Sequence, residues 1–131
     1  MNDTGAESSP YSARSAFALN PVFINVQSVE GSSEYEDEIQ KAKAEFEKLG
    51  KIDYYHISTW KRFVLRKIFD NRYSDLKKDK GLQAWIEENS WAKPYCVYCT
   101  LKAKNDEASW KDWPEYRDPS AKDIEKLWKK Y

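Results

Sequence analysis

The sequence has few of the residues that disulfide frameworks and metal centres use, with two cysteines and one histidine among 131 residues. Small secreted domains usually carry more cysteines than this, so we expect a reduced, cytoplasmic protein without bound metal or cofactor. No apolar run approaches the roughly 20 residues of a membrane-spanning helix, and the mean hydropathy is −0.91. The start of the sequence also shows no secretory signal pattern. We therefore expect neither a membrane nor an export pathway to be involved.

An excess of charge of either sign is missing as well. Lys plus Arg number 22, Asp plus Glu number 22, and the formal net charge is zero. A balanced chain has no electrostatic reason to bind a polyanion. The composition therefore predicts that nucleic acid is not a partner.

Aromatic residues, by contrast, are abundant. They make up 15% of the chain, with six tryptophans and nine tyrosines. A core of this size cannot bury that many large rings, so some should face a partner, a ligand or further protein. For five tryptophans the pattern favours packing. Three lie on apolar helix stripes and two precede a proline: Trp60, Trp85, Trp128, Trp110 and Trp113.

Hydrophobic periodicity predicts a mainly α-helical chain with one or two short strands. A strand is expected at 22–26, and helices at 33–49, 54–69, 81–90, 94–104 and from Pro119 to the end. Ser33 and Glu36 form a capping-box pattern, while Asp53 and Asp118 are expected N-caps. Gly50 should stop the first helix. Residues 70–80 are polar and are expected to form a connector.

Cys96 and Cys99 form a C-x-x-C pattern that could indicate a metal or redox site. A structural zinc ion needs about four ligands, and His56 would raise the candidate ligands only to three. Both cysteines lie inside an apolar helical run, which favours two buried free thiols. His56 has no nucleophile in a recognisable context, so we assign it no catalytic role. We expect no metal site.

Several motifs follow one another in an order that resembles one enzyme family. They are Asn2-Asp3-Thr4-Gly5, Ser9-Pro10-Tyr11 with Ser15-Ala16-Phe17-Ala18 and Asn20-Pro21, Ile52-Asp53-Tyr54 before Lys61, Trp91 and Tyr95 before Leu101-Lys102, and Trp110 with Trp113-Pro114 and Arg117. Together they resemble the amylomaltases, the 4-alpha-glucanotransferases or disproportionating enzymes of glycoside hydrolase family 77.

The resemblance implies an α/β parent fold, a (β/α)8 TIM barrel with helical insertions, of which this chain would be a fragment. Residues 1–32 would form a barrel loop and short strand of the catalytic domain. Residues 33–131 would form a helical insertion subdomain of the same domain, truncated at its C-terminus.

The resemblance also implies a function. Family members transfer α-1,4-glucan units between maltooligosaccharides by a retaining mechanism that needs two carboxyl groups. The motifs that carry those carboxylates are absent from this sequence, so we expect no catalytic residue in it and no activity from the chain alone. Ser9, Pro10 and Tyr11 are the expected substrate-binding residues. Two alternatives stay open: a free-standing helical protein-interaction module and a non-catalytic glucan-binding module.

Overall fold

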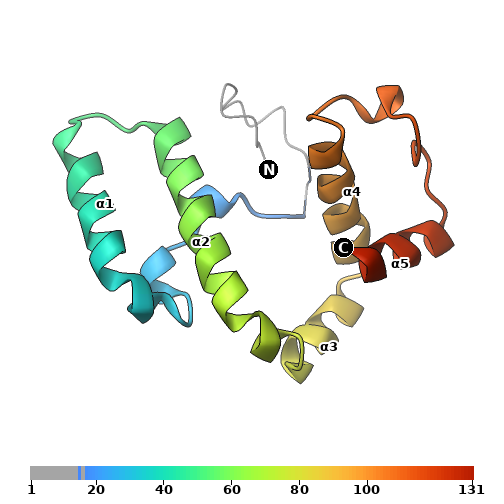
Figure 1. Cartoon of the computed structure of the whole chain (residues 1–131), viewed down its shortest axis with the longest axis horizontal. Coiled ribbons are helices and arrows are strands. Elements are labelled where there is room, and N and C mark those ends of the chain that lie inside the picture. Colours follow the sequence, from blue (N-terminus) through green and yellow to red (C-terminus); the bar gives the residue numbers. More distant parts are fainter. Residues whose placement is uncertain (1–14, 16) are drawn as a thin grey trace. The chain divides into compact units, whose positions relative to one another are not determined.

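The computed structural model describes Ser15 and residues 17–131, and it divides the chain into two compact units. The first unit is Met1–Lys78 and the second is Asp79–Tyr131. Each unit is built from helices joined by turns (Figure 1). We describe the two units separately.

Within its described residues, the first unit has three 3-10 turns and two α-helices: η2 (Pro21–Phe23), η3 (Val26–Ser28), η4 (Ser32–Tyr35), α1 (Glu36–Lys48) and α2 (Tyr54–Leu76). Those of the second unit are α3 (Lys80–Glu88), α4 (Ala92–Lys104), η5 (Trp110–Asp112) and α5 (Ala121–Lys130). The prediction of a mainly helical chain is confirmed.

The strand predicted at 22–26 is wrong, and the described residues contain no strand. The Asn20 side chain accepts a hydrogen bond from the Val22 amide at 3.0 Å, and the Ile24 amide donates to the Pro21 carbonyl at 3.0 Å. These local bonds bend the backbone into a 3-10 turn, which an apolar run alone does not reveal. A strand would need a partner strand for the same backbone groups.

The start of α1 also differs from the prediction. Ser33 lies in η4 and α1 begins at Glu36, where Tyr35 makes no capping side-chain bond. The Glu36 carboxylate instead accepts hydrogen bonds from Gln27 at 3.0 Å and Gln40 at 2.7 Å. The predicted stop is confirmed, because Gly50 follows the helix with a left-handed φ of 61°.

Helix α2 begins as predicted but runs further. Asp53 caps it by accepting a hydrogen bond from the His56 amide at 3.1 Å. This hydrogen bond is the main reason why the pKa of the Asp53 carboxyl is lowered. The helix then continues to Leu76, so the connector predicted at 70–80 is wrong over most of its length. Asn71 and Arg72 have partners elsewhere in the first unit, which gives this polar stretch a reason to stay helical.

Two helix starts in the second unit are shifted from their predicted positions. Helix α4 begins at Ala92, and Pro94 lies in its first turn, where no intrahelical donor is needed. Helix α5 is capped by Ser120 rather than Asp118. The Asp123 amide donates to Ser120 Oγ at 3.2 Å and the Ser120 amide donates to the Asp123 carboxylate at 3.0 Å. This reciprocal pair is a capping box.

Each unit has its own small apolar core. The buried residues are Val26, Ile39, Val64 and Ile68 in the first unit, and Val97, Leu101, Trp113 and Leu127 in the second. Packing is confirmed for Trp113, which is 2% exposed, and for Trp60 and Trp128, which pack against these cores. Trp85 and Trp110 are 47% and 46% exposed and lie outside both cores, although the Trp85 ring meets the Trp91 ring edge to face, so for these two packing stays a prediction.

The prediction of two buried thiols is wrong for Cys96. Cys96 is exposed and Cys99 is half-buried on α4. The buried side chains of α4 are Ala92, Val97 and Leu101, and neither cysteine is among them. Desolvation of the sulfur, followed by the charge of Cys99, raises the pKa of the Cys96 thiol.

In the first unit, residues 20–35, which we call the N-terminal segment, are fastened to α2 by polar side chains. Arg72 pairs with the Glu30 carboxylate at 2.8 Å and donates to the Glu30 carbonyl at 3.2 Å. Asn71 donates to Glu34 at 2.5 Å. Gly31 lies directly against Arg72, with a φ of 90° that side-chain-bearing residues rarely adopt.

Gly31→Ala is expected to destabilise the first unit. A Cβ at Gly31 would lie 2.7 Å from Arg72 Cδ, so Arg72 would have to shift away from Glu30. The positive φ alone costs about 1–2 kcal/mol for an L-residue. Gly50→Ala is the matched control, because Gly50 also has a positive φ but a Cβ added there would have no atom within 4 Å. Urea unfolding should show a larger loss for Gly31→Ala; equal losses would contradict the role of the Arg72 contact.

Candidate functional site

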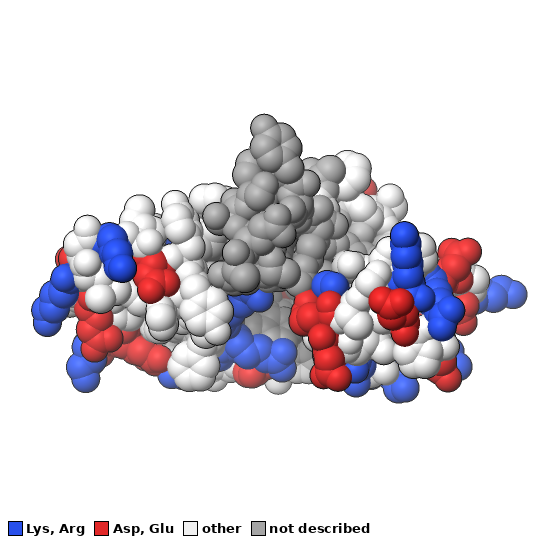
Figure 2. Space-filling model, turned by 90° about the horizontal axis from the view of Figure 1, so that it is seen from above, with Lys and Arg blue, Asp and Glu red and all other residues white. Residues whose placement is uncertain are grey.

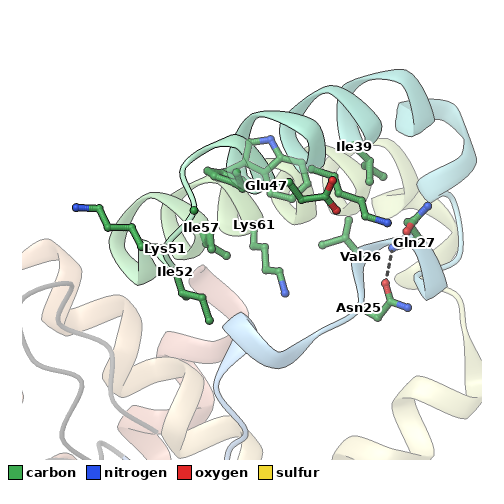
Figure 3. Close-up of a pocket in the computed structure, with 13 residues that line it drawn as sticks. Asn25, Val26, Gln27, Ile39, Glu47, Lys51, Ile52, Ile57 and Lys61 are labelled. Carbon is green, nitrogen blue, oxygen red and sulfur yellow. Dashed lines mark hydrogen bonds between the residues drawn. The ribbon is translucent and has the colours of Figure 1, made fainter.

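The substrate-binding residues predicted from the sequence, Ser9, Pro10 and Tyr11, lie outside the described residues. Their role therefore stays a prediction. The described part of the first unit contains a cleft that sequence reasoning did not identify, and we call it the first cleft (Figure 3).

The first cleft has a volume of about 470 Å³. It lies among α1, the turn that follows it, the first turns of α2 and the start of η3. Its apolar lining is Val26, Ile39, Phe46, Ile52, Ile57 and Trp60, and its polar lining includes Asn25, Gln27, Lys43, Glu47, Lys51 and Lys61. Cleft volumes between about 300 and 1,000 Å³ are typical of small-molecule sites.

Helical spacing brings these side chains together. On α1, Ile39, Lys43, Phe46 and Glu47 follow one another at intervals of three or four residues, or adjoin, and so share one side of the helix. The Phe46 ring meets the Trp60 ring of α2 edge to face, with centroids 5.9 Å apart. The spacing was visible in the sequence, but the turn that faces α1 toward α2 was not.

Lys61 fixes the wall that the N-terminal segment contributes. In Figure 3 its side chain extends from α2 toward the chain before Asn25, whereas Lys51 points away from the other labelled side chains. The Lys61 ammonium donates to the Val22 carbonyl at 2.5 Å and to the Ile24 carbonyl at 2.9 Å. Desolvation lowers the pKa of Lys61. We interpret Lys61 as a positioning residue.

The described lining of the first cleft contains one carboxylate. A retaining glycosyl transfer needs two carboxyl groups about 5 Å apart, and Glu47 is the one carboxylate among the described residues that line this cleft. His56 lies nearby in sequence but pairs with Asp53 at 2.7 Å and is exposed. No group of three or more potential metal ligands occurs within the described residues.

The surface charge agrees with the balanced composition. On the face drawn in Figure 2, basic and acidic side chains are interspersed among uncharged ones. Within residues 17–131, no helix is long and apolar enough to cross a membrane.

A protein-family model described as 4-alpha-glucanotransferase matches residues 1–131. The chain belongs to this glycoside hydrolase family. The family resemblance drawn from the sequence motifs is therefore confirmed, and the match extends over both units.

Individual relatives carry the same description. A 4-alpha-glucanotransferase of Oryza sativa subsp. japonica is 29% identical over 97% of this chain. Those of Clostridium butyricum and Chlamydia caviae are 32% and 28% identical over 86% and 88% of it. The chain spans 14%, 23% and 22% of the length of these three relatives. No solved structure matches the chain.

Lys61→Met should loosen the N-terminal segment. The variant keeps most of the apolar stem but leaves the Val22 and Ile24 carbonyls without this donor, and hydrogen bonds from charged groups contribute about 1.5–3 kcal/mol. We expect the free energy of unfolding to fall by about 1–2 kcal/mol and amide hydrogen exchange to accelerate at residues 22–28. Lys51→Met is the control, because Lys51 also lines the cleft but makes no hydrogen bond to another described residue. Unchanged exchange in Lys61→Met would refute the fastening role.

Proposed function

We propose that the chain is a segment of a 4-alpha-glucanotransferase that transfers α-1,4-glucan units between maltooligosaccharides by a retaining mechanism. The observation that carries this proposal is the family match along residues 1–131, together with the small share of each relative that the chain covers. The substrate is an α-1,4-glucan, no cofactor takes part, and the enzyme is cytoplasmic.

The segment contributes substrate binding and leaves the covalent chemistry to residues elsewhere in the enzyme. Ser9 and Tyr11 hydrogen-bond or stack on the glucan, and Pro10 shapes their loop. A tyrosine suits this task because it offers an apolar ring face and a hydroxyl. The carboxylate nucleophile and the acid–base carboxyl lie outside this sequence.

Residues 1–32 belong to a (β/α)8 catalytic domain and residues 33–131 form a helical insertion in it. Exposed apolar side chains support contact with further polypeptide, because a soluble monomer rarely exposes many of them close together. Phe17, Leu19 and Phe23 are 70%, 88% and 81% exposed within seven residues of sequence. In the intact enzyme these side chains pack against the rest of the catalytic domain.

The chain alone is expected to be catalytically silent. Maltotriose incubated with the 131-residue protein should give neither glucose nor longer oligosaccharides, as followed by chromatography. The intact enzyme serves as the positive control. Turnover by the isolated chain that disappears when one of its own residues is mutated would refute the segment proposal.

In the intact enzyme, Tyr11→Ala should weaken glucan use more than it lowers stability. Loss of one well-placed sugar contact costs on the order of 1–3 kcal/mol, which is a roughly ten- to hundred-fold loss in kcat/KM on maltotriose. Tyr73→Ala is the matched control, because Tyr73 is 50% exposed and lies on α2. A Tyr11→Ala enzyme that melts many degrees lower yet keeps its kcat/KM would remove Tyr11 from the binding site.

A further inference from the structure

The second unit contains a cleft of its own, which we call the second cleft. It has a volume of about 550 Å³ and lies among α4, η5 and the turn that leads into α5. Four aromatic side chains line it: Tyr98, Trp110, Trp113 and Tyr116. The tryptophans and Arg117 belong to the motif at 110–118 that the family resemblance singled out, and neither the fold nor the proposed substrate loop gives that motif a role in binding.

The floor of the second cleft is held rigidly. Trp113 is 2% exposed, and its indole N–H donates to the Ala108 carbonyl at 3.1 Å. The Tyr98 ring lies against it, with centroids 5.6 Å apart and planes inclined by 33°. Trp110 differs from Trp113 because it is 46% exposed, so its ring is accessible to a ligand.

The backbone of the cleft wall is strained at Tyr116. This residue has a φ of 58°, in the left-handed region that a bulky side chain rarely occupies. Strain of this kind persists only where the surroundings enforce it, and it concentrates at functional sites. Tyr116 lines the second cleft and directly precedes two charged lining residues, Arg117 and Asp118.

Those two residues are exposed, and they supply polar groups that have no partner among the residues that the structure describes. Arg117 uses Nε to donate to the Trp113 carbonyl at 2.5 Å. Its two terminal nitrogens, and the Asp118 carboxylate, make no hydrogen bond or ion pair with any residue that the structure describes. The second cleft therefore combines aromatic faces with both a donor and an acceptor.

We propose that the second cleft is an accessory binding site for an α-1,4-glucan segment of about two or three glucose units, a size that a cleft of this volume accepts. The choice of sugar rests on the proposed function. The apolar faces of glucose rings stack on Trp110 and the tyrosines, and sugar hydroxyls, which both donate and accept, pair with Asp118 and Arg117. A purely apolar occupant would make no use of these two exposed polar groups, and an anionic one would meet the Asp118 carboxylate.

The test is the affinity of the 131-residue chain for maltotriose, measured by calorimetry. Trp110→Ala removes the accessible ring and Asp118→Ala removes the acceptor, and each should weaken binding by about tenfold. Trp85→Ala is the matched control: Trp85 has nearly the same exposure, 47%, but does not line the second cleft. It should leave the affinity unchanged within about twofold. Melting temperatures check that each variant is folded. If Trp110→Ala does not fold, the affinity of the Asp118→Ala variant decides the test.

Three outcomes would overturn the proposal. They are no binding of maltotriose to the unmodified chain, equal losses in the Trp110 and Trp85 variants, and equal affinity for cellotriose, whose β-linkage gives a different shape. Binding of an apolar dye in the cleft without sugar binding would point to a protein segment as the occupant, and would also overturn it. Activity of the intact enzyme is read separately. An active enzyme whose segment binds no maltotriose refutes only the accessory site, whereas an inactive enzyme with Trp110-dependent binding refutes only the proposed function.

Discussion

The first unit depends on the attachment of its N-terminal segment to α2. This segment forms only 3-10 turns of its own, and several of its carbonyls and carboxylates find partners on α2. Lys61 and Arg72 provide them, and Gly31 allows the close approach. The attachment places Val26 in the core beside Ile39. It also supplies one wall of the first cleft, so the core and the cleft share Val26 and Ile39.

A single tryptophan plays the corresponding part in the second unit. Trp113 joins the core formed by Val97, Leu101 and Leu127 while its indole N–H holds the Ala108 carbonyl. That bond closes the turn after α4, where the backbone passes through left-handed conformations at Asp106 and Glu107. Two requirements meet in one side chain: a large ring to fill a small core, and an N–H group to satisfy a backbone carbonyl.

Among their described lining residues, neither cleft has the paired carboxylates of a retaining glycosyl transfer, and both have aromatic rings beside a few polar groups. A pair of catalytic carboxyl groups must be held in position to within a fraction of an ångström. A binding surface needs less precise positioning, so helical units with small cores can provide one. Aromatic rings beside a few polar groups are the kind of lining that binding sites use, and this supports the proposal that the segment contributes substrate binding.

The sequence by itself determined the family, the helical class and several helix ends, because capping and periodicity are local. Asp53 caps the start of α2 with its carboxylate, and Gly50 follows the end of α1 in a left-handed conformation that suits glycine. Other features were decided by tertiary structure. The polar end of α2 stayed helical because its partners, Glu30 and Glu34, are distant in sequence. The run at 22–26 formed turns through local hydrogen bonds, and the distant Lys61 holds it against α2. Packing likewise decided which tryptophans are buried. An apolar stripe in the sequence shows which side of a helix is apolar, but only a neighbouring element in the fold can cover that side.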